Sequence, residues 1–206
     1  MNNKQQTRNL VLSAVFTALI IVMSFTPLGY LRIGFVSISF MTIPVALGAI
    51  LLGPWYGAYF GLLFGVTSFI QCFTGDLFGA MLVGVSPVLT AVMCIIPRIL
   101  IGLLSGLIFV GIKKASKNDI GAFLTAGLSA PLINTVLFMG FMMAFFYNNP
   151  AFHTGLESLG ITGYNSVFNL LWIMIGTNGI IEFFACGVIA FALSKSLSTV
   201  LLKRVG

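Results

Sequence analysis

Three small groups of basic residues divide the sequence into two long apolar stretches. The groups are Lys4 and Arg8, then Lys113, Lys114 and Lys117, then Lys195, Lys203 and Arg204. Only 7% of the 206 residues are charged and 59% are hydrophobic, whereas roughly 25% of residues are charged in soluble domains. Such a chain would expose more apolar surface than water tolerates. We therefore predict an integral membrane protein that binds no nucleic acid, with the basic groups marking its topology.

The spacing of the basic groups predicts the number of crossings. If all three groups are cytoplasmic, an even number of crossings separates each pair. Residues 9–112 suit four crossings of about 20 residues, and 118–194 suit two crossings with a long loop. We predict one all-α membrane domain over 1–206, with six transmembrane helices and both termini cytoplasmic. The expected helices cover approximately 10–30, 36–53, 55–73, 88–112, 120–147 and 167–194.

Small residues recur at a spacing of four on two of the expected helices. They are Gly57, Gly61 and Gly65 on the third helix and Gly102 and Gly106 on the fourth. Small residues at this spacing let two helix backbones approach closely, so we interpret them as packing positions inside the bundle. The connection 74–87 is itself apolar, and we expect it to fold over the protein.

Polar side chains inside the expected spans are informative, because an ionisable group at membrane depth costs at least about 2.5–3.5 kcal/mol. Arg98, Asn134 and Asn178 belong to three different helices. At 1.5 Å per residue they fall at similar depth, roughly 15–20 Å from the outer surface. Glu182 lies one turn deeper than Asn178 on the same helix, and Thr67 and Gln71 lie on the outer half of the third helix. The full set of candidate binding residues is Arg98, Asn134, Gln71, Asn178, Thr67 and Glu182.

Two interpretations of this polar layer remain open. In the first, it lines a solute pocket that opens outward, where Arg98 pairs with an anionic group and the amides read hydroxyl or amide groups. Arginine suits a carboxylate because its planar fork donates two parallel hydrogen bonds. In the second, Arg98 and Glu182 form a structural ion pair, and Asn134 and Asn178 join helices. The first is favoured because intramembrane ionisable residues usually serve function, and the two can coexist.

The motifs of the common enzyme classes are not found in the sequence. It has no GxxxxGK[ST], HExxH or GxSxG motif and no paired carboxylates at catalytic spacing. We expect no catalytic site, no metal and no cofactor. Cys72, Cys94 and Cys186 have no CxxC spacing or nearby His, so we interpret them as packing residues. His153 is expected to be a solvated loop residue.

Several segments of the sequence are distinctive when taken together. They are the Ala14-xxx-Ala18 pair, Thr42-Ile43-Pro44, Gly48-Ala49-Ile50-Leu51-Leu52-Gly53-Pro54, Gly57, Gly61, Phe64-Gly65, Thr67-Ser68-Phe69, Pro97-Arg98 and Asn134-Thr135-Val136-Leu137-Phe138-Met139-Gly140. With these segments, its length and its expected six helices, the sequence resembles the S components of energy-coupling factor (ECF) vitamin transporters over nearly its whole length, most closely the pantothenate-specific branch.

The resemblance implies a vitamin-capturing subunit of the bacterial cell membrane. It would transport only when joined to a transmembrane coupling subunit and two ATPase subunits, and it would topple in the membrane to release its ligand. Ala14 and Ala18 would contact the coupling subunit. The loops 26–36 and 74–87 would cover a pocket on the outer half. Pantothenate has a carboxylate, an amide and two hydroxyls, which would suit Arg98 and the neighbouring amides.

Several alternatives to pantothenate capture stay open at this point. S components for riboflavin, folate or pyridoxine share the fold, and biotin or another small carboxylate would also suit an arginine. A structural subunit of a membrane complex would use the polar layer only to join helices. A stand-alone carrier would use Glu182 to move protons.

Overall fold

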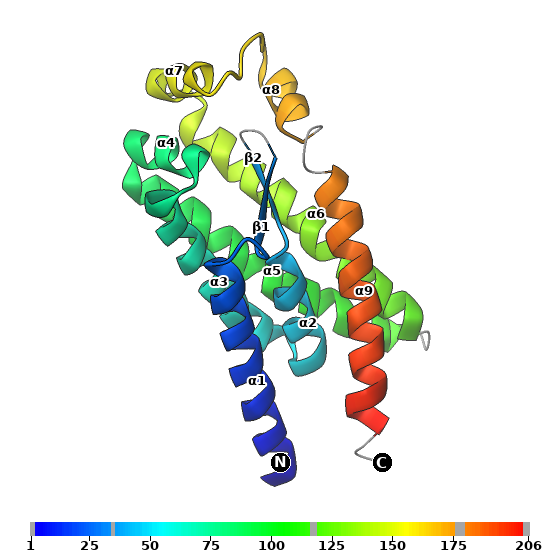
Figure 1. Ribbon diagram of the computed structural model, residues 1–206. Coiled ribbons are helices and arrows are strands. Elements are labelled where there is room, and N and C mark those ends of the chain that lie inside the picture. The colour runs from blue at the N-terminus through cyan, green and yellow to red at the C-terminus, as the bar shows by residue number, and fades with distance from the viewer. Residues whose placement is uncertain (1–2, 34–35, 116–118, 176–179, 204–206) are drawn as a thin grey trace.

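The computed structural model describes residues 3–33, 36–115, 119–175 and 180–203, and this part of the chain is helical apart from one short hairpin. The long helices form an elongated bundle, and α1 begins at the same end at which α9 finishes (Figure 1). The elements are α1 Asn3–Ser24, β1 Tyr30–Ile33, β2 Val36–Ser39, α2 Thr42–Leu52, α3 Pro54–Thr74, α4 Leu77–Val85, α5 Pro87–Ala115, α6 Asp119–Phe146, α7 Pro150–Ser158, α8 Val167–Met174 and α9 Ile180–Lys203.

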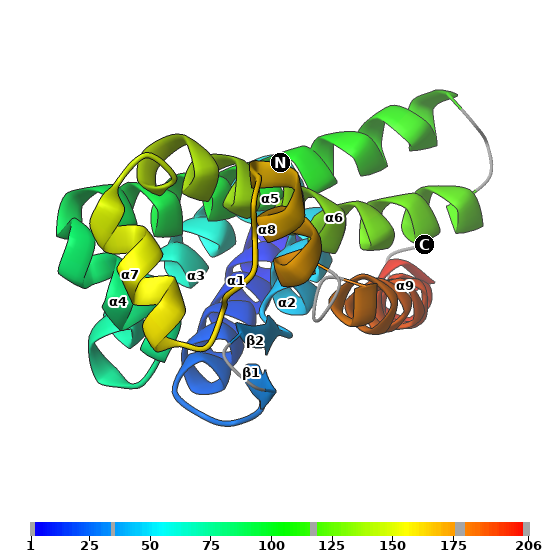
Figure 2. The same cartoon turned by 90° about the horizontal axis from the view of Figure 1, so that it is seen from above.

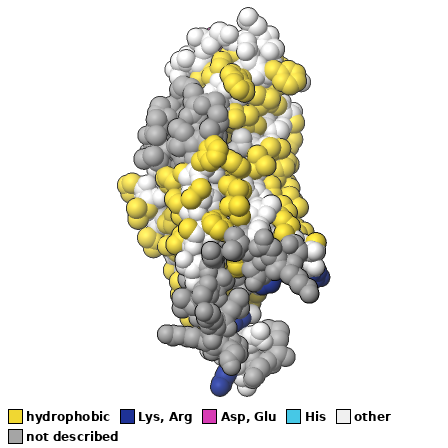
Figure 3. Space-filling model, turned by 90° about the vertical axis from the view of Figure 1, so that its right-hand side faces the viewer, with side chains coloured by type: hydrophobic (Ala, Val, Ile, Leu, Met, Phe, Trp, Pro, Cys, Tyr) yellow, Lys and Arg dark blue, Asp and Glu magenta, His cyan; other side chains and the backbone are white. Residues whose placement is uncertain are grey.

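Four of the described helices are long and apolar enough to cross a membrane. They are α1, α3, α5 and the 121–146 part of α6. Hydrophobic side chains cover much of the described surface in Figure 3, where Lys and Arg appear only near the end at which α1 begins. These features fit a membrane protein, and six crossings stay a prediction.

The second expected helix, 36–53, needs correction. Residues 36–39 form β2, and only Thr42–Leu52 are helical. At 1.5 Å per residue an 11-residue helix rises about 16 Å, which is about half of a bilayer core. All its residues from Thr42 to Ile50 are buried, so α2 lies inside the bundle.

A β-hairpin replaces the end of the first expected helix and the start of the second. α1 ends at Ser24 instead of residue 30, and β1 then pairs antiparallel with β2, with Tyr30 opposite Ser39. The segment Val36–Ser39 alternates apolar and polar residues, a period of two that favours a strand. Figure 1 shows the hairpin in front of α5 and α6, and Figure 2 shows it at one side of the bundle. The Cys186 thiol of α9 donates to the Ser39 carbonyl at 3.4 Å.

The last expected helix, 167–194, comprises parts of two helices. α8 ends at Met174 and α9 begins at Ile180, while 176–179 lie outside the described residues. The expected helices 55–73, 88–112 and 120–147 correspond to α3, α5 and α6, with bounds shifted by up to three residues.

Glycines bring α3 and α5 into backbone contact. A Cβ added to Gly61 would collide with the Arg98 carbonyl, and one added to Gly57 would collide with the Gly102 carbonyl. At Gly65 it would lie 2.9 Å from the Cys94 carbonyl oxygen. The packing role inferred for these glycines is confirmed, and it holds the backbone of Arg98 directly against α3.

The expectation that 74–87 folds over the protein is also confirmed. It forms α4, whose Phe78 and Leu82 are buried. α4 contacts α3, α5 and α7, and Figure 2 shows α7 lying beside α4 at the same end of the molecule. Phe152 and Leu156 of α7 join the same hydrophobic cluster. Together the two short helices cap this end of the bundle.

His153 of α7 is held in the cap, contrary to the expectation that it is simply solvated. Its Nε2 lies 2.7 Å from the Tyr147 carbonyl oxygen, and its Nδ1 lies 2.9 Å from the Tyr164 hydroxyl. A carbonyl can only accept, so Nε2 carries the hydrogen, and Nδ1 of the neutral ring accepts from Tyr164. His153 therefore ties the segment after α7 to the end of α6.

Candidate functional site

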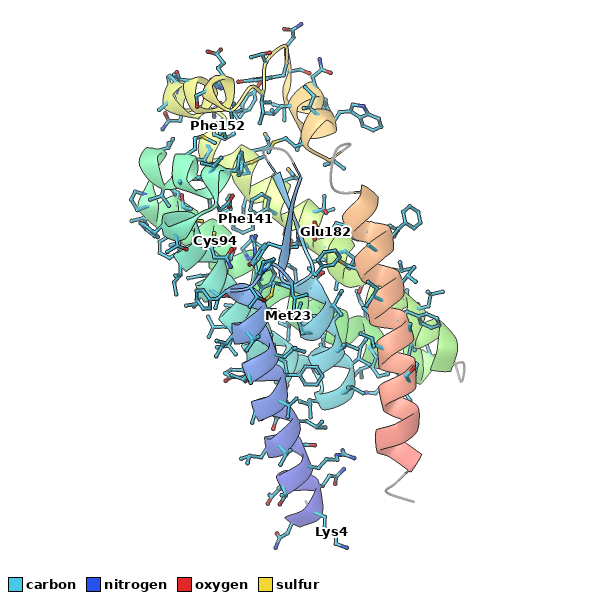
Figure 4. All side chains as sticks on the ribbon, viewed as in Figure 1. Lys4, Met23, Cys94, Phe141, Phe152 and Glu182 are labelled. Carbon is cyan, nitrogen blue, oxygen red and sulfur yellow. The ribbon has the colours of Figure 1, made fainter. Side chains whose placement is uncertain are left out.

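A cavity of about 100 Å³ lies inside the bundle, next to α4 of the cap. A single water needs only about 10–15 Å³, so this space can hold several waters or part of a small solute. Its polar wall is assembled from six elements. They contribute Tyr30 of β1, Ser39 of β2, Ser68 and Gln71 of α3, Arg98 of α5, Asn134 and Thr135 of α6 and Glu182 of α9, and Asp76, just before α4, also lines the cavity. In Figure 4, Glu182 on α9 and Cys94 on α5 lie in the middle of the molecule, well below Phe152 of the cap.

Arg98 brings a positive charge to this cavity. Only 7% of the residue is exposed. Its Nη1 donates to the Met93 carbonyl oxygen at 2.9 Å, and its Cζ lies 4.7 Å from the ring centre of Phe138 and 5.5 Å from that of Phe64. Aromatic faces attract a guanidinium. The buried Nε has no hydrogen-bond partner in the part of the chain that the structure describes, so a donor remains for an anion.

Asn134 and Glu182 form a pair that joins α6 to α9. The Nδ2 of Asn134 donates to Oε1 of Glu182 at 2.9 Å. This bond uses the amide donor and leaves Oδ1 of Asn134 buried, with no partner among the described residues. The observed partner of the Glu182 carboxylate is thus an amide, and the observed partner of Arg98 is a carbonyl of its own helix. Two hydroxyls of the cavity lining, Tyr30 OH and Ser39 Oγ, are also buried without a partner among the described residues, so the site offers several unused hydrogen-bonding groups.

Gln71 and Thr67 lie on the same helix but have different surroundings. Gln71 lines the cavity, and its Nε2 donates to the Ser24 carbonyl at the end of α1. Thr67 lies outside that lining. Its Oγ1 accepts from Ser24 Oγ at 2.9 Å and donates to the Phe64 carbonyl at 3.0 Å. Thr67 therefore joins α1 to α3 and does not line the cavity.

The remaining sequence candidates lie elsewhere. Asn178 lies outside the described residues. Ala14 and Ala18 are exposed on α1. They are therefore accessible to lipid or to a protein partner.

Sequence reasoning missed several residues of the cavity wall, namely Tyr30, Ser39, Ser68 and Asp76. Tyr30 and Ser39 were assigned to helices, although they form a cross-strand pair of the hairpin. The two-residue alternation in 36–39 was the available signal. Asp76 directly precedes α4.

Comparison with known proteins decides what kind of molecule carries this cavity. A family model described as the ECF transporter, substrate-specific component, matches residues 8–194. The chain belongs to this family. A curated relative, the pantothenate transporter PanT of Leuconostoc mesenteroides subsp. mesenteroides, is 32% identical over 187 residues, which cover 82% of this chain and 87% of the relative. The resemblance noted in the sequence is confirmed. The protein is an S component, the substrate-specific membrane subunit of an ECF importer.

Proposed function

We propose that this S component captures pantothenate in the cavity beside Arg98. The supporting observation is that the cavity lining holds unused buried polar groups, among them the cationic donor Arg98 Nε and the acceptor Asn134 Oδ1. The similarity to a pantothenate transporter points to the same ligand. Pantothenate offers one carboxylate, one amide and two hydroxyls, so it can satisfy a cationic donor and a neutral acceptor at once.

Arg98 is proposed to bind the carboxylate. The guanidinium fork made by Nε and Nη2 can donate two parallel hydrogen bonds to a carboxylate, and Nη1 is already held by the Met93 carbonyl. That bond and the ring of Phe138 fix the plane of the guanidinium. A charged ligand group then meets an oriented partner and loses little free energy to reorganisation.

The amide side chains are proposed to read the rest of the ligand. Asn134 Oδ1 can accept from a hydroxyl or an amide N–H. The side-chain oxygen of Gln71 can do the same, since its Nε2 is engaged with Ser24. Glu182 holds the Asn134 amide in this orientation. Asn178 stays a candidate for the same layer by its position in the sequence.

The membrane arrangement and partners are also proposed. We infer six crossings with both termini cytoplasmic, in a bacterial plasma membrane. Transport would require a transmembrane coupling subunit and two ATPase subunits, with Ala14 and Ala18 contacting the coupling subunit. Their exposure on α1 supports this role.

The test is equilibrium binding of labelled pantothenate to the purified chain in detergent. Arg98→Ala should weaken binding by at least about 2 kcal/mol, or roughly 30-fold. Arg98→Lys should restore part of the affinity, since an ammonium cannot reproduce the fork. Lys114→Ala, an exposed cation on the same helix, is the matched control and should bind normally. Unchanged affinity in a folded Arg98→Ala protein would refute the role of Arg98. Binding of riboflavin, folate, pyridoxine or biotin in place of pantothenate would refute the ligand.

A further inference from the structure

Two cysteines from different helices meet on the wall of the ligand cavity. The Sγ atoms of Cys72 on α3 and Cys94 on α5 are 3.9 Å apart, and both residues line the cavity. Both are buried, with 4% and 3% of their surfaces exposed. They are separated by 22 positions in the sequence, so no short motif indicates the pair. The third cysteine, Cys186, lies apart and donates to the Ser39 carbonyl.

The surroundings of the pair restrict what it can bind. α4 lies directly over Cys72, because a Cβ added to Gly79 would come within 2.6 Å of its Sγ. Among the described residues, no group of three or more His, Cys, Asp or Glu side chains could hold a metal ion. Structural zinc needs four ligands, so the pair alone does not suit zinc. Two thiols can satisfy only an ion that accepts two soft ligands.

We propose that Cys72 and Cys94 form a two-coordinate site for a soft monovalent metal ion of the Cu(I) type. Thiolates are the ligands that select Cu(I). With metal–sulfur bonds of about 2.2–2.3 Å, a linear S–metal–S unit spans roughly 4.5 Å. The observed 3.9 Å is shorter by about 0.6 Å, which small side-chain rotations supply. A disulfide would require the sulfurs to close to about 2.05 Å, a larger movement of two tightly packed helices.

The charge balance of the binding step involves Arg98. Each thiol loses its proton, two sulfur–metal bonds form and no electron is transferred, so the product is a bis-thiolate unit with one negative charge. Arg98 follows Cys94 by four residues on α5, which places both on one face of the helix, and its side chain lines the same cavity. Asp76 and Glu182 are the acidic groups of the same lining and Arg98 is its cation, so the guanidinium can offset the negative charge of the metal unit.

A consequence follows for ligand capture, and this part rests on the proposed function. The metal unit and the pantothenate carboxylate would compete for the charge of Arg98 and for space in one cavity. A bound soft metal should therefore inhibit capture, and bound pantothenate should slow metal uptake.

The experiment uses Ag⁺, a redox-inert ion that prefers two ligands, added to the reduced, detergent-purified full chain in chloride-free buffer. Native mass spectrometry counts the bound ions, and maleimide labelling counts the thiols that stay reactive. The wild type and the control Cys186→Ser should bind one ion per chain, with Cys72 and Cys94 protected together. Cys72→Ser and Cys94→Ser should each lose more than about 100-fold in Ag⁺ affinity, because loss of a direct ligand costs more than the 10–100-fold of an outer contact.

Wild-type Ag⁺ affinity in the Cys72→Ser/Cys94→Ser double variant would overturn the site. Protection of only one thiol per bound ion in the wild type would overturn it as well, and this measurement needs no variant to fold. The number of bound Ag⁺ ions is measured without pantothenate. It therefore tests the metal site even if this chain does not bind pantothenate. Undiminished pantothenate binding by the Ag⁺-loaded chain would refute the competition alone.

Discussion

At the scale of single residues, the site is defined by hydrogen-bonding groups that the protein leaves unused. A buried polar group without a partner costs about 1–3 kcal/mol, and the buried Arg98 Nε and Asn134 Oδ1 are both in this state among the described residues. Arg98 Nη1 and Asn134 Nδ2 are engaged, by the Met93 carbonyl and by Glu182. Because each side chain is only partly hydrogen-bonded, a site whose ligand supplies the missing hydrogen bonds is favoured over a purely structural network.

Substitutions at Asn134 and Glu182 can show which of the two contacts the ligand and which only positions the other. Glu182→Gln keeps an oxygen that can accept from Asn134 Nδ2, so pantothenate affinity should fall by less than about 10-fold. Asn134→Leu removes the acceptor offered to the ligand, and affinity should fall by more than about 10-fold. Calorimetric titration of both variants measures the difference. The reverse ranking would make Glu182 the direct ligand contact. Loss of ATP-driven uptake in Glu182→Gln with intact binding would favour a proton-carrying role.

At the scale of elements, the glycine contacts between α3 and α5 set the position of Arg98. Helix backbones come this close only where side chains are absent, and Gly61 lies against the carbonyl of Arg98 itself. Any bulk at this contact displaces the helix that carries the guanidinium. The geometry of the cavity thus depends on residues that do not line it.

Alanine substitutions at two glycines, one at the helix contact and one away from it, test this dependence. Gly61→Ala places a methyl group against backbone atoms that cannot move aside as a side chain can, so both the melting temperature and the pantothenate affinity should fall. Gly140→Ala is the control, because an added Cβ there meets nothing within 4 Å. It should leave affinity unchanged and stabilise α6 by up to about 1 kcal/mol through helix propensity. Thermal unfolding and ligand titration of both proteins provide the measurement, and equal effects would refute the contact.

The same elements show what the sequence could predict. The four-residue spacing of Gly57, Gly61 and Gly65 indicated a close helix contact because backbone approach depends directly on the absence of Cβ atoms. The hairpin and the short α2 were missed because a long apolar run looks the same for a spanning helix and for buried short elements. The depth argument correctly brought Arg98 and Asn134 to one cavity, since rise per residue is nearly constant within a helix.

At the scale of the whole molecule, the position of the cap relative to the membrane can be tested directly. We expect α7 to face the outside and the end of α5 to face the cytoplasm. A cysteine introduced at the exposed Ser158 should react with an impermeant maleimide added to intact cells, and one at the exposed Lys114 should react only after the cells are opened. Both are introduced into a chain whose three native cysteines, Cys72, Cys94 and Cys186, are replaced by Ser, so no native thiol contributes to the signal. Labelling of both positions from outside would contradict six crossings with cytoplasmic termini.

The assembly surface is proposed to lie on α1, remote from the cavity. Ala14 and Ala18 are one turn apart and exposed, and a close helix contact there would leave no room for a larger side chain. Ala14→Trp or Ala18→Trp should block assembly with the coupling subunit and abolish ATP-driven uptake, while pantothenate affinity of the isolated chain stays normal.

Leu19→Trp is the matched control for that surface, because Leu19 is 40% exposed yet points about 100° away from Ala18 and about 140° away from Ala14 around the helix axis. Copurification with the partner subunits and uptake into proteoliposomes should both be retained in this variant. If Leu19→Trp were as damaging as Ala14→Trp, a specific alanine contact would be refuted. Uptake by the purified chain alone, without ATP or partners, would instead identify a stand-alone carrier. A chain that binds no vitamin would identify a structural subunit, so binding and uptake measured in the same variants separate capture from coupling.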